Sequence, residues 1–229
     1  MDNINGKVYI VDNRLICVII EVVTSHHLLW PFPPGRNYNV STINAANITE
    51  KTVVDNLKRN VYRFRNATAT LKDQYIPPSG KRITNRHVLK YLSTKTIAEL
   101  SEATSFNSTE MNTTLVETYH SFSTISSCLE LIGNDEKTFG HSELSKYITE
   151  AQKALSDVQF DLHTTLHTWG IGLEKRQYDC VKISCRILEL NDDHCKQLNR
   201  RMANRQLRSY RDYIIINQSL AYVKRLFEQ

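Results

Sequence analysis

The sequence predicts an all-α protein: a four-helix bundle whose first two helices run up and whose last two run down. Four long segments place apolar residues at helical spacing. The connections between these segments are long, short and long, and a long connection lets the chain cross back and lay the next helix parallel to the previous one. Seven Gly and five Pro among 229 residues are also few for a turn-rich β fold.

Residues 1–25 have the features of a secretory signal peptide. Lys7 and Arg14 precede an apolar run, and the small or medium residues that follow favour cleavage after Ser25. We therefore expect a secreted, extracellular protein. The alternative is that this segment is a buried strand or helix of an intracellular domain.

A flexible leader is expected at 26–46, because its consecutive prolines exclude helix. The helical domain is expected at 47–229. Its first helix is predicted over about 48–74, with Asn47 or Thr49 as the N-cap, and two prolines follow its end.

The segment 81–106 is predicted to be a structured crossover that holds one or two short helices. The second long helix is predicted from about 108 to 132, where Gly133-Asn134 provides a C-cap. After a short polar link, the third long helix is predicted over about 142–169, and two glycines end it.

The second long connection covers 170–191 and is expected to hold a local helix at about 181–190. The last helix is predicted to begin after a cap at Asn191-Asp192-Asp193 and to reach the C-terminus. A polar gap around Gln206 and Ser209 interrupts the apolar face of this helix.

Cysteines and sequons also favour secretion. Without the cysteine of the signal segment an even set of four remains, which suits two disulfides: Cys128, Cys180, Cys185 and Cys195. Three pairings are possible, and the spacing selects none of them. Six sequons are present, and we expect glycans at Asn39, Asn47, Asn66, Asn107 and Asn112. The sixth acceptor, Asn217, lies at the edge of an apolar face and is a poorer site.

No catalytic constellation is found, so we expect neither an enzyme nor a bound cofactor or metal. The chain has no Gly-x-Ser-x-Gly elbow and no His-Glu-x-x-His motif. His163 and His167 are four residues apart on one helix face, but two ligands are too few for a zinc site, and we interpret them as solvated. Cys185 with His194-Cys195 could contribute to a metal site, although secretion favours a disulfide. No stretch is long and apolar enough to span a membrane.

Positive charge is concentrated in the last helix. Cleavage after residue 25 removes two cations and three anions, which raises the net charge from +5 to +6. At 100° per residue, Arg200, Arg208 and Arg211 are expected on the face opposite the apolar stripe. Such a face suits an acidic receptor surface or a sulfated matrix polysaccharide, or it is simply solvated.

The chain combines four helices in long–short–long order with a leader and a basic last helix. In these features it resembles the long-chain helical cytokines, which include the interleukin-6 and leptin group and the insect unpaired ligands. The resemblance covers about residues 48–227. The segment 208–216, Arg-Ser-Tyr-Arg-Asp-Tyr-Ile-Ile-Ile, is similar to the last helix of such a ligand. The resemblance implies a secreted ligand that binds a cell-surface receptor and activates JAK–STAT signalling without chemistry of its own. On this basis receptor contacts are expected at Arg200, Arg201, Arg208 and Arg211.

Two other functions fit the composition. A secreted helical carrier of a lipid or small hydrophobic ligand requires an apolar cavity between the helices. An intracellular basic helical protein that binds nucleic acid requires residues 1–25 to be retained. Nucleic acid is the less favoured partner, because the cations are not interleaved with exposed aromatic residues.

Overall fold

The computed structural model describes residues 50–77, 82–100, 111–139, 143–173, 176, 178–196 and 204–227. The predicted signal segment and leader lie outside these residues. The same holds for the predicted glycan acceptors Asn39, Asn47 and Asn107, and for the predicted receptor contacts Arg200 and Arg201.

The predicted all-α class is confirmed for the part of the chain that the structure describes, which contains helices and no strand. The four long helices are α1 (Glu50–Asp73), α3 (Met111–Phe139), α4 (Ser145–Thr168) and α8 (Arg205–Phe227). Among the described residues of the connections, three short helices are found: α2 (Arg86–Ser93), α5 (Cys180–Ile187) and α6 (Asp192–Lys196). The connections between the long helices cover residues 74–110, 140–144 and 169–204.

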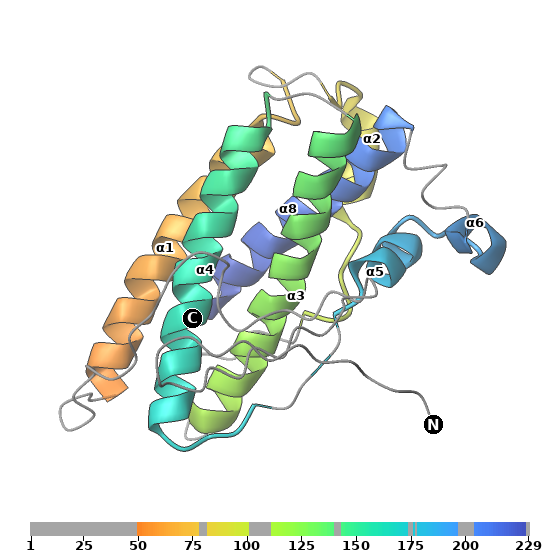
Figure 1. Cartoon of the computed structure of the whole chain (residues 1–229). Coiled ribbons are helices and arrows are strands. Elements are labelled where there is room, and N and C mark those ends of the chain that lie inside the picture. Colours follow the sequence, from red (N-terminus) through yellow and green to blue (C-terminus); the bar gives the residue numbers. More distant parts are fainter. Residues whose placement is uncertain are drawn as a thin grey trace, which may run out of the picture.

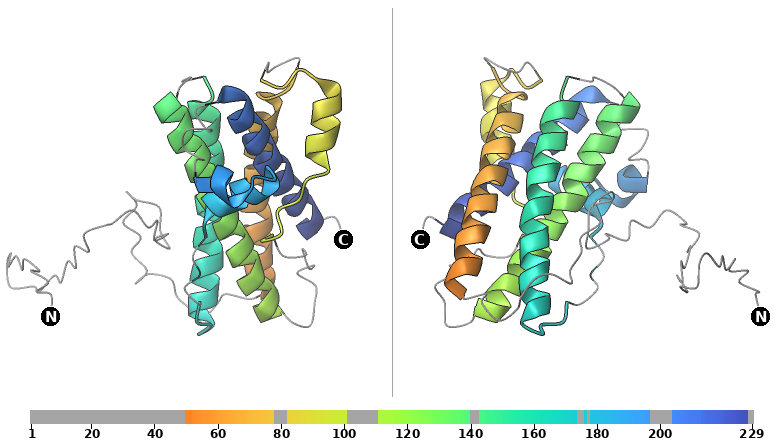
Figure 2. Two further views of the ribbon diagram at one scale, coloured as in Figure 1. Left: turned by 90° about the vertical axis from the view of Figure 1, so that its right-hand side faces the viewer. Right: turned by 60° about the vertical axis from the view of Figure 1, so that its left-hand side comes forward.

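The four long helices lie side by side, and the two that come first in the chain run opposite to the two that come last. In Figure 1, α1 and α3 rise from bottom to top, whereas α4 and α8 descend. Helix α4 packs between α1 and α3, and α8 packs against both α1 and α3 on the other side. Figure 2 shows the same arrangement from two further sides. Each of these four packed pairs is therefore antiparallel.

Short polar side chains begin the later helices. The Oδ1 atom of Asn85 accepts hydrogen bonds from two backbone N–H groups at the start of α2, and Asp179 caps α5 through Lys182 N at 3.1 Å. The side chain of Asn191 accepts from the third residue beyond it at 2.9 Å, and Asn204 accepts from the N–H of Gln206 at 2.9 Å. These bonds satisfy N–H groups that have no partner within a helix.

The sequence predicts an apolar stripe for α4 made of Leu144, Ile148, Ala151, Leu155, Val158, Leu162, Thr165 and Trp169. All of these are buried except Trp169, which is half-buried. At the middle of the core, Phe122 of α3 contacts Phe64 of α1 and Tyr222 of α8 edge to face, with ring centroids 5.9 and 5.7 Å apart. Aromatic pairs of this geometry add to the energy of burying their apolar surface. One set of side chains thus joins three of the long helices.

Two predicted helix boundaries are wrong. Gly133 does not end α3, which continues to Phe139. This glycine is instead a point of close approach between α3 and α4. A Cβ atom at Gly133 would lie 3.2 Å from Nε2 of Gln152 and 3.4 Å from Cγ2 of Ile148 on α4. The last helix begins at Arg205 rather than after Asn191-Asp192-Asp193, because Asn204 caps a new helix there.

Candidate functional site

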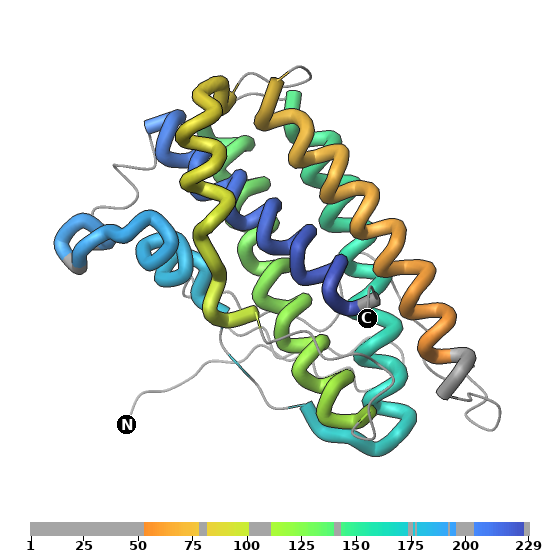
Figure 3. The backbone as a smooth tube through the Cα atoms, turned by 180° about the vertical axis from the view of Figure 1, so that it is seen from behind, coloured from red at the N-terminus to blue at the C-terminus, as the bar shows by residue number. Residues whose placement is uncertain are grey.

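The predicted outward orientation of Arg208 and Arg211 is wrong. Arg208 is 4% exposed and Arg211 is 0% exposed. Both arginines lie on the core-facing side of α8, where Arg211 stands one turn before the buried Ile215. The side chain of Arg211 contacts Asp135 of α3, and that of Arg208 contacts Phe139 of the same helix. Figure 3 shows α2 and the segment after it running along α8. Neither arginine can touch a partner directly without the helices separating.

Arg211 instead belongs to a buried ionic cluster. This cluster lies near the C-terminal ends of α1 and α3. The Nη1 atom of Arg211 donates to Oδ2 of Asp135 at 2.7 Å, and its Nε atom donates to Oδ1 of Asp212 at 2.8 Å. The hydroxyl of Tyr75 donates to Oδ2 of Asp212 at 3.2 Å. Beside this group, the guanidinium of Arg82 forms a bidentate pair with Glu136 at 2.8 and 2.9 Å.

The pKa directions follow from this burial and pairing. Burial alone lowers the pKa of Arg211, but the charges of Asp212 and Asp135 raise it overall, so the guanidinium stays charged. Burial raises the pKa of Asp212, and Arg211 opposes that shift. Burial and then the charge of Asp212 raise the pKa of Tyr75 well above its ordinary value. The cluster therefore fixes the ends of three helices.

Arg208 packs its guanidinium over the ring of Phe139, 4.7 Å from the centroid. An open hollow of about 350 Å³ lies close by and is lined by Arg82, Arg205, Gln206 and Ser209. Arg82 is already paired with Glu136, and the hydroxyl of Ser209 donates to the carbonyl of Arg205 at 2.9 Å. All four lining residues have polar or charged side chains, which does not suit a lipid.

The candidate functional site is the exposed surface where the two long connections meet. We call this surface the crossover face and define it by Lys90, Tyr91, Lys95, Glu99, Arg186 and Glu189. Lys95 pairs with Glu189, and Arg186 pairs with Glu99, so the first connection is joined to the second at two points about 90 residues apart in sequence. Tyr91 adds a third link by donating to Oε2 of Glu189 at 3.3 Å.

Tyr91 stands at the centre of the crossover face. Its side chain is 53% exposed, which is unusual for a large aromatic residue on a helix that packs against the core. The ammonium of Lys95 lies 4.4 Å from the centroid of its ring. Side-chain hydrogen bonds to Glu189 and Tyr91 raise the pKa of Lys95, and the bond to Lys95 lowers the pKa of Glu189. Tyrosine and arginine are enriched at protein interfaces, and Tyr91 and Arg186 supply both here.

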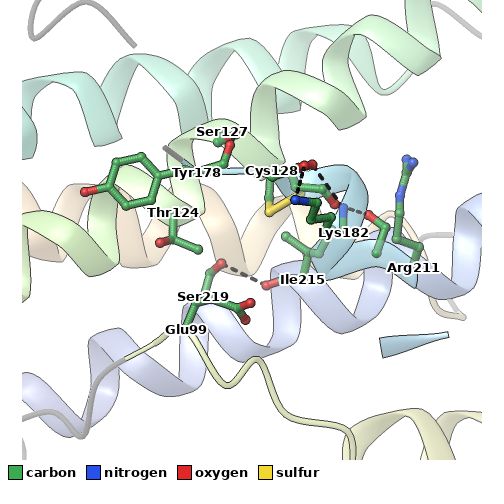
Figure 4. The surroundings of a disulfide bond; sticks show 12 residues. Glu99, Thr124, Ser127, Cys128, Tyr178, Lys182, Arg211, Ile215 and Ser219 are labelled. Carbon is green, nitrogen blue, oxygen red and sulfur yellow. Dashed lines mark hydrogen bonds and ion pairs between the residues drawn. A yellow bond between two sulfur atoms is a disulfide. The ribbon is translucent and has the colours of Figure 1, made fainter. Parts of the chain in front are cut away.

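Two disulfides hold this surface in place. The structure selects one of the three possible pairings, Cys128–Cys180 and Cys185–Cys195, with S–S distances of 2.10 and 2.03 Å. Figure 4 shows the first of these between α3 and the start of α5, with Ile215 and Ser219 of α8 nearby. The hydroxyl of Ser127 also donates to the carbonyl of Tyr178 at 3.0 Å. Helix α5 is thus fixed to α3 covalently.

The predicted histidine pair adopts a stacked arrangement. His163 is half-buried, and its ring lies 6.4 Å from that of His167 and 6.2 Å from that of Tyr119 on α3. Burial and then the charge of His167 lower the pKa of His163. Among the residues with described positions, no group of three or more His, Cys, Asp or Glu side chains could hold a metal ion.

Three of the six acceptor asparagines can be located. Asn66 is exposed on the outer side of α1, and Asn112 is exposed in the first turn of α3. Asn217 is half-buried on α8, and its Oδ1 accepts a hydrogen bond of 2.7 Å from Lys72. The exposed acceptors Asn66 and Asn112 stay predicted glycan sites.

Comparison with known proteins gives no relative: neither a protein-family model, nor a curated protein, nor a solved structure matches this chain. None of the helices that the structure describes has the length and apolar character that crossing a membrane requires. The functional assignment therefore depends on the helix arrangement and on the crossover face.

Proposed function

We propose that the protein is a secreted ligand of the helical-cytokine type, which binds a cell-surface receptor and thereby activates JAK–STAT signalling. In this proposal the four long helices form an up-up-down-down bundle with long first and third connections. The protein acts by binding and catalyses no reaction.

The observation that carries the proposal is the direction of the long helices. Helices α1 and α3 run opposite to α4 and α8, and each helix packs against antiparallel neighbours. A chain that joins its helices by short loops gives alternating directions, so this arrangement needs the two long connections. The resemblance to long-chain cytokines predicts the same order, although the directions alone do not identify a function.

Secretion is supported by the disulfides. Cys128–Cys180 and Cys185–Cys195 use all four cysteines that remain beyond the predicted signal segment. Disulfides persist in oxidising compartments such as the extracellular space and are rare in the cytosol.

The crossover face is our proposed receptor contact. It is exposed, it is held by a disulfide and two ion pairs, and it presents Tyr91 together with Lys90 and Arg186. Preorganised surfaces lose little conformational entropy on binding, and tyrosine and arginine are frequent hot-spot residues. This surface replaces Arg208 and Arg211, which are buried, whereas Arg200 and Arg201 stay predicted contacts.

The experiment is to apply the purified, secreted protein to cells that carry candidate receptors and a STAT reporter. We expect a dose-dependent response. Tyr91→Ala should raise the half-maximal concentration by at least about tenfold, the size expected for a central interface tyrosine. The matched control is Tyr62→Ala, because Tyr62 is 60% exposed on α1 and is not part of the crossover face.

Both variants should keep the helical circular dichroism of the parent. A silent reporter across the candidate receptors would contradict the cytokine assignment. A response that depends on Tyr62 and not on Tyr91 would place the receptor contact on α1 instead. The carrier alternative has less support, because Phe64, Phe122 and Tyr222 fill the middle of the core.

A further inference from the structure

His163 and His167 form a pair of imidazoles on one side of the last two turns of α4. They stand four residues apart, and this spacing in an α-helix places two side chains on one face, one turn from each other. Their rings are stacked, with centroids 6.4 Å apart and planes inclined by 18°. His167 is exposed, whereas His163 is half-buried. The expectation that both are solvated therefore holds fully only for His167.

Helix α3 holds one member of the pair in position. The ring of Tyr119 on α3 lies 6.2 Å from that of His163 and is tilted by 49° to it. One turn earlier on α4, Nε2 of Gln159 donates to Oγ of Ser123 on α3 at 3.3 Å. This side of α4 thus borders its contact with α3. A side chain that is already held loses little conformational entropy when it binds a ligand, while the exposed His167 can adjust to the ligand.

The separation of the two rings is within reach of a common metal ion. Zn–N bonds are about 2.0–2.1 Å long, so two imidazoles on one ion have centroids at most about 6.5 Å apart, and about 5 Å apart at a tetrahedral angle. The observed separation is 6.4 Å. A shift of the exposed His167 ring by about 1 Å would bring both rings to one ion, and histidines with this spacing on a helix bind zinc in the His-Glu-x-x-His motif.

The electrostatics of the pair also favour a bound cation. His167 lies in the last turn of α4, where the helix dipole stabilises positive charge. Burial and then the charge of His167 lower the pKa of His163, which favours the neutral imidazole that a metal ion requires. Two protonated rings repel each other here, whereas two neutral rings can share one cation.

We propose that His163 and His167 together chelate one divalent transition-metal ion of the kind that imidazole prefers, such as Zn²⁺, Ni²⁺ or Cu²⁺. Imidazole nitrogen suits these ions, whereas Mg²⁺ and Ca²⁺ require oxygen ligands. The described residues supply no group of three or more ligands, so water takes the remaining positions on the ion. The ion joins two successive turns of α4 and stabilises the C-terminal end of this helix, because it binds only the folded arrangement.

This site is independent of the proposed receptor function. It lies on α4 and shares no residue with the crossover face, so metal binding and receptor signalling can fail separately. A protein that leaves the STAT reporter silent but binds zinc through His163 and His167 would leave this inference standing.

The test is calorimetric titration of the full secreted chain with Zn²⁺ near pH 7.5. The reference protein carries His26→Gln and His27→Gln, which remove two histidines that are adjacent in the sequence and could bind the ion on their own. We expect one ion per chain with a dissociation constant in the micromolar range, and no binding of Mg²⁺. Binding should weaken towards pH 5.5, because protons compete with the ion for both imidazoles.

The matched variant exchanges one ligand with its neighbour through His167→Thr and Thr168→His in the reference protein. It keeps the composition and the net charge but turns one imidazole by about 100° around the helix. His163→Gln removes the other ligand, and His87→Gln removes an exposed histidine of α2 as a further control. Circular dichroism checks that every variant keeps its helices.

We expect the exchange variant and His163→Gln to bind Zn²⁺ at least about tenfold more weakly, because the second imidazole no longer reaches an ion held by the first. His87→Gln should bind like the reference protein. Undiminished binding by the exchange variant would overturn the proposal, since it would show that the two rings do not act on one ion. A reference protein that binds no Zn²⁺, or that binds Mg²⁺ as tightly, would overturn it as well.

Discussion

The guanidinium of Arg211 on α8 donates to the carboxylate of Asp135 on α3 across 2.7 Å, and the arginine side chain is fully buried. A second carboxylate, that of Asp212, accepts from the same guanidinium and also from Tyr75 at the end of α1. One arginine thus connects the last long helix to the ends of the first two.

Replacement of Arg211 by Met should destabilise the protein by about 3–5 kcal/mol, because Asp212 would be left buried without its cation. Chemical denaturation followed by circular dichroism measures the change. The control is Arg205→Met on the same helix, where the side chain is exposed and the cost should stay within about 0.5 kcal/mol. Equal effects at the two positions would show that the buried cluster does not form.

The two disulfides should differ in their contribution to stability. Cys128–Cys180 closes a loop with a sequence separation of 52 and Cys185–Cys195 one of 10. If the disulfides act by restricting the unfolded chain, the first contributes about 4 and the second about 3 kcal/mol. Paired Cys→Ala variants, measured by denaturation, should therefore rank in that order. Mass mapping of the unreduced protein checks the pairing, and a Cys128–Cys195 peptide would contradict it.

Stability should fall as the solution becomes acidic, and His163 should contribute to this loss. Its pKa is lowered by burial and by His167, so the unfolded chain binds this proton more readily than the folded protein. The contribution is therefore present near neutral pH and is lost as the pH falls through the ordinary histidine range, about 6.5. His163→Gln should lose less stability than the parent between pH 7.5 and pH 5.

The control for this experiment is His87→Gln, because His87 is exposed on α2. Its pH dependence should match that of the parent in the same denaturation series. If His163→Gln also follows the parent, the stacked pair with His167 does not disfavour protonation.

Asn66 should carry a glycan when the chain is expressed in secreting eukaryotic cells, because it lies exposed on the outer side of α1 within a sequon. Asn66→Gln should remove one step of the mobility shift that a glycosidase abolishes. The control is Asn56→Gln, because Asn56 is also exposed on α1 but is not part of a sequon. Protein recovered from the medium without any glycosidase-sensitive shift would contradict the predicted glycans, and absence of the protein from the medium would argue against secretion.

The spacing of apolar residues in the sequence was sufficient to predict the features that depend on a single helix. The stripe of α4 from Leu144 to Thr165 needs only a helical period and a single packed side, and these residues are buried as predicted. The two short helices α2 and α5 also fall within the segments predicted to hold local helices.

Features that depend on a third element could not be predicted in this way. The outward assignment of Arg211 rested on a single apolar stripe of α8, but this arginine lies on the same side of α8 as the buried Ile215 and pairs with Asp135 of α3. In the sequence, Gly133-Asn134 has the residue types of a helix C-cap. The close approach of Gln152 on α4 shows why a glycine stands at position 133 within the helix. The crossover face depends on pairs such as Lys95 with Glu189, whose partners are far apart in the sequence.

The burial of α8 has a consequence for the order in which the protein can assemble. This helix is the last of the four to leave the ribosome, yet it supplies one wall of the core and the cation that neutralises Asp135. Until it emerges, the inner sides of α1 and α3 and a carboxylate on α3 face water or a chaperone. Folding therefore has to be completed after synthesis of α8, and a nascent chain that stops before Arg211 leaves the inner apolar surface of α1 and α3 exposed and prone to aggregation.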